Sequence, residues 1–265
     1  MTKTVLVTGA SGFLAGYIID DLLRHGYTVH GTVRSLARSE RALAERFANS
    51  DRVRLFQVDD LVTRRDQLLE AMHTCDAVLH TASPYQLTVQ DPLKEFIEPA
   101  ITGTLNVLET ALELGIERVV ITSSFAAVTN FDLGGPWRDY TYTDADWNPT
   151  TLEQALAPGK PGPFVYSASK TLAERAAHDF ADKHPSISVT TMNPPMIYSA
   201  PLQSIKTKHD INTSSNAIYT LINSHSDGDD EVPWNRLPLF CATEDVAFAH
   251  RRAIEVDVDK VRGKR

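Results

Sequence analysis

The sequence predicts an α/β protein built around a doubly wound parallel sheet. Three observations lead to this fold class: short apolar runs typical of buried strands, longer amphipathic runs between them, and a glycine-spaced turn where the first such pair meets. Strands that alternate with helices long enough to serve as crossover connections form parallel sheets with helices on both faces.

The first strand, the turn after it and the first helix form a phosphate-binding pattern. Thr4–Thr8 is short, β-branched and apolar, whereas Phe13–Arg24 has apolar residues at helical spacing and Gly26 after its end. Between them, Gly9 permits a tight turn, and Gly12 removes a side chain that would keep a pyrophosphate from the helix amides. This order predicts a dinucleotide site, although a tight turn without a ligand is the alternative.

The alternation of strands and helices continues along the chain. We expect further strands at residues 28–33, 53–58, 77–81, 118–122 and 188–191. We expect helices at residues 39–48, 68–72, 93–114 and 166–184, of which the last three connect parallel strands.

Two segments interrupt this alternation. Residues 130–163 are rich in glycine, proline, aromatics and acids, and residues 199–239 are polar with one helix candidate at 217–223. Both follow strand ends, where open α/β sheets bind ligands, so we expect them to cover a substrate. The predicted organisation is a dinucleotide-binding domain at 1–198, which carries the catalytic residues, and a partial substrate lobe at 199–265.

Composition argues against several classes of partner. The formal net charge is −8 and no basic run offsets it, which disfavours nucleic acid and anionic membranes as partners. Cys75 and Cys241 lie far apart and form no metal or redox motif, so we expect no metal site. Because the first strand begins by Thr4 and no apolar run is long enough to span a membrane, we expect a cytoplasmic protein. The oligomeric state stays open.

The end of the second expected strand indicates which nicotinamide cofactor is used. An acid there would bind a ribose 2′-hydroxyl, whereas Arg34, with Arg38 four residues on, offers cations to a 2′-phosphate. NADPH is therefore favoured, against the alternative that both are solvated surface arginines. Asp60 follows the third strand, where a carboxylate can accept from an adenine amine. Residues 81–83 are small enough for close backbone approach to a cofactor, although ordinary turn chemistry explains them equally well.

Tyr166 and Lys170 are four residues apart and share one face of an expected helix. Such a pair is common by chance, but this one opens the helix after the 130–163 segment, and Ser124 ends the preceding strand. A lysine ammonium beside a phenol lowers the tyrosine pKa from about 10. Tyr166 is therefore a candidate general acid, and Ser124 could hold a carbonyl oxygen as negative charge develops on it.

These motifs together resemble those of the extended short-chain dehydrogenase/reductase superfamily. They read TGASGFLA at 8–15, TVRS at 32–35, HTASP at 80–84, TSS at 122–124 and YSASK at 166–170. The alanine at the third glycine position and the arginine after the second strand are similar to the dihydroflavonol-reductase-like branch, which includes microbial NADPH-dependent methylglyoxal and aldehyde reductases. The resemblance runs from about residue 3 to 265 and implies a Rossmann-type fold.

The resemblance also implies roles for individual residues. The catalytic trio would be Ser124, Tyr166 and Lys170, with Asn106 a weaker candidate helper in a proton relay. Lys170 would also hold the nicotinamide ribose. The substrate pocket would be lined by Tyr85, Phe125 and Met196. The residues expected to contact NADP(H) are Gly9, Ser11, Gly12, Phe13, Leu14, Arg34, Arg38, Asp60, Leu61, Thr81, Ala82, Ser83, Tyr166, Lys170, Pro194 and Met196.

Three departures from the family pattern concern the substrate side. The Asn-Pro strand end continues into Ser199-Ala200 rather than Gly-Pro, and residues 242–247 read ATEDVA instead of a DVRDVA-like signature. Relatives also continue beyond the segment that here ends in Arg265, into another strand and further helices, so the resemblance implies a partial substrate lobe.

The leading hypothesis is NADPH-dependent reduction of a small aldehyde or ketone, with Tyr166 protonating the nascent alkoxide. A flavonoid-ketone or cinnamoyl-thioester reductase of the same fold is an alternative. A non-catalytic NADP(H)-binding regulator and an inactive truncated relative are others, and the tyrosine–lysine pair favours an enzyme over the regulator.

Overall fold

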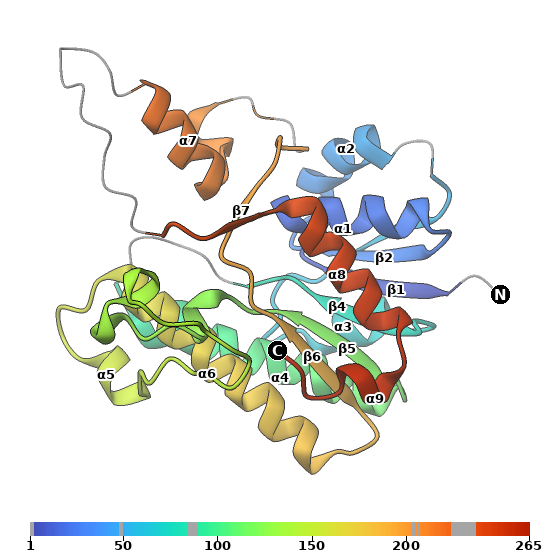
Figure 1. Ribbon diagram of the computed structural model, residues 1–265. Helices are drawn as coiled ribbons and strands as arrows, with labels where there is room; N and C mark the ends of the chain where they lie inside the picture. Colours follow the sequence, from blue (N-terminus) through green and yellow to red (C-terminus); the bar gives the residue numbers. More distant parts are fainter. Residues whose placement is uncertain (1–2, 48–49, 84–89, 203–204, 206, 224–236) are drawn as a thin grey trace.

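The computed structural model describes residues 3–47, 50–83, 90–202, 205, 207–223 and 237–265 (Figure 1). Six parallel strands form the central sheet, in the order β3-β2-β1-β4-β5-β6. They are β1 (Thr4–Thr8), β2 (Thr28–Val33), β3 (Val53–Gln57), β4 (Ala77–His80), β5 (Arg118–Thr122) and β6 (Ser188–Met192). The strand order reverses between β1 and β4, which opens a ligand crevice at their carboxyl ends. The predicted doubly wound, Rossmann-type fold is confirmed.

Helices cover both faces of this sheet. On one face lie α1 (Phe13–Arg24), α2 (Leu36–Phe47) and α8 (Thr243–Glu255), and on the other lie α3 (Arg65–Met72), α4 (Glu98–Glu113) and α6 (Gly162–Lys183). The core is divided accordingly, because successive strand residues point to opposite faces. In β1, Val5 and Val7 pack against α1 and α8, whereas Leu6 packs against α3 and α4.

Several helices begin earlier than the apolar spacing indicates. α2, α3 and α6 start at Leu36, Arg65 and Gly162, each three or four residues before the expected start. The first turns of α2 and α3 carry mainly polar or small residues, so hydrophobic spacing does not mark them, whereas α6 begins with Gly162 and Pro163 ahead of Phe164 and Val165. The single helix expected at 93–114 is divided into a π-helical turn, η1 (Leu93–Ile97), and α4.

The two interrupting segments carry short elements. Residues 130–163 contain η3 (Phe131–Leu133), η4 (Gly135–Trp137) and α5 (Leu152–Leu156), and η2 (Phe125–Ala127) immediately precedes them. After β6, β7 (Met196–Tyr198) pairs in parallel with β8 (Phe240–Ala242), and η5 (Lys208–Asp210) and α7 (Thr213–Asn223) lie between them in sequence. None of the described helices is both long and apolar enough to cross a bilayer.

The end of the chain packs against the main sheet. Figure 1 shows α8 running beside α1, and four buried α8 residues join the core of that face: Val246, Ala247, Ala253 and Ile254. After α9 (Val258–Val261), the Gly263 amide donates to the Val189 carbonyl and the Thr191 amide to the Lys264 carbonyl, at 2.9 Å each. The division into a dinucleotide-binding domain at 1–198 and a partial substrate lobe at 199–265 stays a prediction.

Candidate active site

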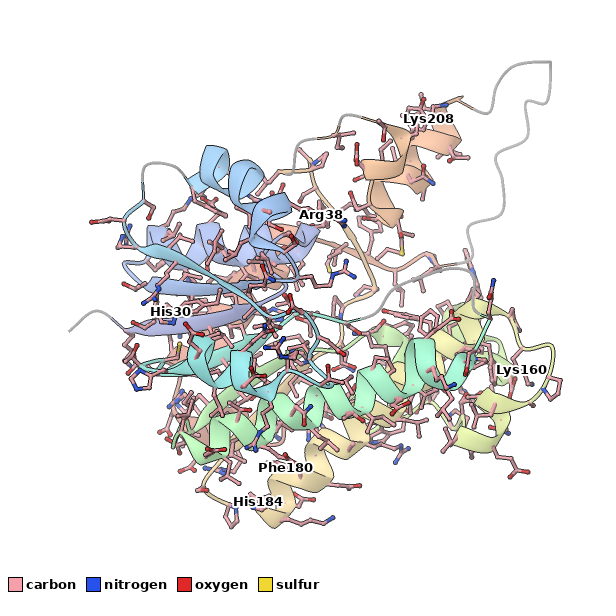
Figure 2. All side chains as sticks on the ribbon, turned by 180° about the vertical axis from the view of Figure 1, so that it is seen from behind. His30, Arg38, Lys160, Phe180, His184 and Lys208 are labelled. Carbon is pink, nitrogen blue, oxygen red and sulfur yellow. The ribbon has the colours of Figure 1, made fainter. Side chains whose placement is uncertain are left out.

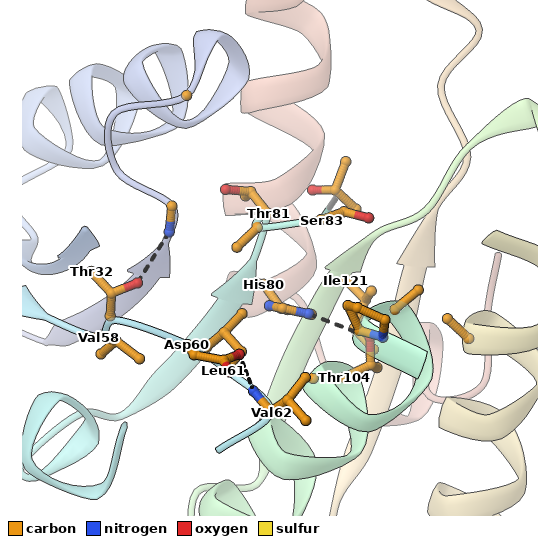
Figure 3. Close-up of a pocket in the computed structure, with 18 of the residues that line it drawn as sticks. Thr32, Val58, Asp60, Leu61, Val62, His80, Thr81, Ser83, Thr104 and Ile121 are labelled. Carbon is orange, nitrogen blue, oxygen red and sulfur yellow. Dashed lines mark hydrogen bonds between the residues drawn. The ribbon is translucent and has the colours of Figure 1, made fainter. Parts of the chain in front are cut away.

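A cavity of about 780 Å³ opens at the carboxyl ends of the strands (Figure 3). The glycine turn, the ends of β2 to β5, and α4 and α6 contribute its walls. The expected cofactor residues that line it are Gly9, Ser11, Gly12, Arg34, Asp60, Leu61, Thr81, Ala82, Ser83 and Lys170. The described site residues that do not line it are Phe13, Leu14, Arg38, Ser124, Phe125, Tyr166, Pro194 and Met196.

The glycine turn is shaped for close approach of an anion. Gly9 has φ +70°, in the left-handed region, and a Cβ there would lie 3.1 Å from the Cβ of Ala82. The amide of Gly12 donates to the Gly9 carbonyl at 2.8 Å, and α1 begins immediately afterwards without a side-chain cap. The first-turn amides of an uncapped helix can bind a phosphate, so this turn fits the pyrophosphate of a dinucleotide.

His80 at the end of β4 organises the neighbouring strand end. The Thr8 hydroxyl accepts from the amides of residues 81–82 at 3.1 and 3.0 Å, so its own hydrogen points to His80 Nδ1 at 2.8 Å. His80 therefore carries its proton on Nε2, which faces the Thr104 hydroxyl at 3.4 Å (Figure 3). Burial, and next the charge of Lys170, lowers the pKa of His80 to about 3, so this ring is neutral.

The loop after β3 is held by its own side chains and by α4. The Asp60 carboxylate accepts from the Val62 amide and the Thr63 hydroxyl, at 2.8 Å each. The Asn106 side-chain amide donates to the carbonyls of Leu61 and Val62, at 2.8 and 2.9 Å. Asn106 thus anchors the loop that carries Asp60, and its described bonds reach none of the expected catalytic trio.

The two arginines lie at the expected end of β2. Arg34 lines the cavity, and Arg38 lies two residues inside α2 (Figure 2). Both are exposed, and the contacts described for this part of the chain give neither guanidinium an acidic partner. Both charges are therefore open to solvent, and that of Arg34 is available to a phosphate group in the cavity.

The expected catalytic residues meet where β5 and α6 come together. Lys170 is buried, and its Nζ donates to the Thr122 carbonyl at 3.1 Å and lies 6.0 Å from the centre of the Tyr166 ring. Burial lowers the pKa of Lys170 to about 8, against the opposing charge of Glu174. Ser124 has an extended backbone, and its Oγ accepts from the Ala126 amide at 3.1 Å, a bond that leaves the hydroxyl hydrogen unused.

The expected substrate residues lie on the segments beyond β5 and β6. The ring of Phe125 packs edge-on against Tyr142 with centres 5.1 Å apart, and its amide donates to the Pro194 carbonyl at 3.0 Å. Met196 opens β7, and its amide donates to the Leu239 carbonyl at 3.3 Å. Tyr85 lies outside the described residues.

Sequence reasoning did not single out several polar residues of the cavity. Among them are Thr32, Asp59, His80, Glu95, Thr104, Ser123 and Glu174. For some the signal was present: Thr32 and His80 are polar residues within the last two positions of apolar strands. Glu174 lies one helical turn beyond Lys170, on the same face of α6.

The fold and the cavity together place the chain in the class of dinucleotide-binding α/β proteins. More narrowly, the chain belongs to the NAD dependent epimerase/dehydratase family, whose model matches residues 5–264. This confirms the predicted kinship with extended reductases.

Individual relatives are similar over nearly the whole chain. It is 38% identical to a putative NADPH-dependent methylglyoxal reductase of Candida albicans, over 100% of this chain and 77% of that protein. It is 37% identical to a cinnamoyl-CoA reductase of Medicago truncatula, over 96% of this chain and 72% of that one. The structure of Gre2 from Candida albicans in complex with NADPH superimposes with a TM-score of 0.86 at 34% identity, covering 99% of this chain and 77% of that one. The chain thus spans about three quarters of these relatives' length.

Proposed function

We propose that this protein reduces the carbonyl group of a small aldehyde or ketone to an alcohol with NADPH. The observation that carries the proposal is the buried Lys170 beside Tyr166, at one side of a cavity whose other side is an uncapped, glycine-rich helix start. The similarity to an NADPH-dependent methylglyoxal reductase supports the same chemistry. A cytoplasmic location agrees with this proposal and remains part of it.

The residues present fit NADP(H). The turn at residues 9–14 would hold the pyrophosphate on the α1 amides, and Arg34 with Arg38 would bind the 2′-phosphate. Asp60 would face the adenine, and the small residues 81–83 would let the backbone approach the cofactor. When bound, NADPH supplies the hydride that the carbonyl carbon receives.

The chain's own residues would stabilise charge on the substrate oxygen and deliver its proton. The Ser124 hydroxyl would donate to the carbonyl oxygen, where negative charge develops during reduction. Tyr166 would then transfer its phenolic proton to that oxygen. The Lys170 ammonium, fixed by the Thr122 carbonyl, favours the phenolate that remains, because opposite charges close together stabilise each other.

A cinnamoyl-thioester reductase is the second candidate function. The 37% identity to the Medicago truncatula cinnamoyl-CoA reductase favours it specifically, and it would use the same cofactor and the same general acid. The two candidates differ in the size and charge of the substrate that must enter beside Phe125 and Met196.

A tyrosine substitution tests the proposal. Tyr166→Phe removes the proton donor and keeps the ring, so turnover should fall by about 100-fold or more while NADPH still raises the melting temperature. Oxidation of NADPH is followed at the nicotinamide absorbance with methylglyoxal, other small aldehydes and ketones, and cinnamoyl-CoA. Tyr27→Phe is the matched control, because its hydroxyl contacts Glu255 at 3.2 Å, on the strand ends opposite the cavity. Parent-like turnover in Tyr166→Phe would remove Tyr166 from the mechanism, and turnover with cinnamoyl-CoA alone would favour the second candidate.

A further inference from the structure

A buried carboxylate lies beneath the candidate active site and has no part in the proton transfer described above. Glu174 is on α6, one turn after Lys170, and its side chain is fully buried. It accepts four hydrogen bonds: from Ser123 Oγ, from Asn193 Nδ2 at 2.8 Å, from Thr191 Oγ1 at 3.0 Å and from Arg265 Nε at 2.5 Å. These donors saturate both carboxylate oxygens.

The hydrogen bonds of Glu174 tie together the strand ends that carry the site. Ser123 directly precedes Ser124, and Asn193 follows β6. Asn193 Nδ2 also reaches the carbonyl of Ser124, at 3.3 Å. Glu174 therefore fixes the position of Ser124 relative to α6, the helix that presents Lys170. It does so through Ser123, which precedes Ser124, and through Asn193, which contacts the Ser124 carbonyl.

Arg265 extends this network to the segment that follows Ser124. Its side chain is 5% exposed, and it donates to the carbonyls of Asp144, Asp146 and Ala127, at 3.1, 2.5 and 3.3 Å. Its guanidinium also lies over the Trp147 ring, 3.5 Å from the ring centre. A buried ion pair contributes little net stability compared with apolar side chains of similar volume, so the consequence of this pair is geometric.

We propose that Glu174 is a positioning residue for carbonyl reduction: it fixes Ser124 against α6, and its charge stabilises the ammonium of Lys170. The proposal rests on the proposed function and assigns no direct contact between Glu174 and substrate. The Glu174 carboxylate would act through the two residues that it holds.

The charges around Lys170 determine the direction of the pH effect. Glu174 and Tyr166 face it from α6 and His80 from β4, and His80 is neutral because burial lowers its pKa to about 3. The other carboxylates that line the cavity are Asp59, Asp60 and Glu95. Glu174 itself faces Arg265 and His178, and burial lowers the pKa of His178. Because burial lowers the pKa of Lys170 and Glu174 opposes that shift, removing the Glu174 charge should lower the Lys170 pKa further.

Glu174→Gln is the direct test. Loss of the Ser124 anchor should lower kcat by about 10- to 100-fold, because small displacements of reacting groups are costly. The alkaline limb of the kcat profile should move to lower pH by about one unit or more, because the ammonium is lost earlier. The Kd for NADPH, measured from protein fluorescence, should change much less than kcat, and hydrogen exchange of residues 122–127 should become faster.

Two further variants separate charge from geometry. Ser123→Ala removes one hydrogen bond and keeps the charge, so kcat should fall while the alkaline limb stays in place. Glu113→Gln is the matched control, because Glu113 forms a half-exposed ion pair with Arg65 at 2.6 Å, away from the cavity. It should leave both kcat and the pH profile unchanged.

The outcomes distinguish this proposal from the proposed function. Absence of NADPH-dependent reduction by the parent protein would refute the function itself. With an active parent, a Glu174→Gln protein that keeps the parent kcat or the parent alkaline limb overturns the positioning role. Should Glu174→Gln not fold, Ser123→Ala still decides: reduced kcat with parent NADPH affinity supports the role, and parent kcat overturns it.

Discussion

Acidification should destabilise the protein through two histidines that are buried as neutral rings. His250 is fully buried on α8, where its Nδ1 donates to the Val246 carbonyl at 2.7 Å and its Nε2 accepts from the Thr122 hydroxyl at 2.7 Å. Burial lowers its pKa to about 4 and that of His80 to about 3, against 6.5 in the unfolded chain. In the folded protein, protonation of either ring would remove the nitrogen that accepts a hydrogen bond from a threonine hydroxyl.

The magnitude follows from the difference between the folded and unfolded pKa values. Each histidine has a lower pKa in the folded protein than in the unfolded chain, so below pH 6.5 the unfolded chain binds protons that the folded protein does not. The stability that the protein has above pH 6.5 is therefore lost as the pH falls toward the folded pKa. A pH of about 5 is about 1.5 units below the histidine pKa of the unfolded chain, and this difference corresponds to about 2 kcal/mol of stability for each ring. The two histidines together should therefore lower the free energy of unfolding by about 4 kcal/mol between about pH 7 and pH 5.

Urea unfolding at about pH 7 and about pH 5 measures this loss. Carboxylates also contribute to acid sensitivity, so the parent is compared with His250→Gln, which should lose about 2 kcal/mol less on acidification. Val246→Ala is the control: it removes apolar packing beside His250 without a titratable group, so it should be less stable at both pH values with the parent pH dependence. Equal losses in the parent and in His250→Gln would refute this explanation.

Three other predictions concern the cofactor half of the site. Replacing Arg34 and Arg38 by glutamine should weaken NADPH relative to NADH by about tenfold or more, because a charge-assisted contact contributes about 1.5–3 kcal/mol; an unchanged Kd ratio would mean that both point to solvent. Gly9→Ala should lower both NADPH affinity and stability, because φ is +70° and the new methyl group would lie 3.1 Å from the Cβ of Ala82. Thermal unfolding with and without NADPH measures both effects, and a melting temperature equal to that of the parent in both conditions would contradict this prediction. Asn106→Ala should weaken NADPH binding and speed hydrogen exchange at residues 60–62 while kcat at saturating NADPH is retained, whereas a loss of kcat alone would instead favour the proton relay.

The sequence by itself determined the parts of this protein that depend on local pattern. Strand and helix periods, the glycine turn and the four-residue spacing of Tyr166 and Lys170 are properties of adjacent residues. They yielded the separate strands and helices and the expected cofactor and catalytic motifs, because residues close in the chain share a turn or a helix face whatever the rest of the molecule does. Helix starts were located less well, in α2 and α3 because their polar first turns carry no apolar pattern.

Only the tertiary structure decided which distant residues share the buried polar networks. Arg265 and Glu174 are 91 positions apart, and Thr8 and His80 are 72 apart. No periodicity connects such pairs, since they meet only when the order of the strands and the packing of the tail against β6 are set. The same packing placed α8 in the core beside α1. A buried polar group must find its partners wherever the folded chain supplies them, so these partners are visible only in three dimensions.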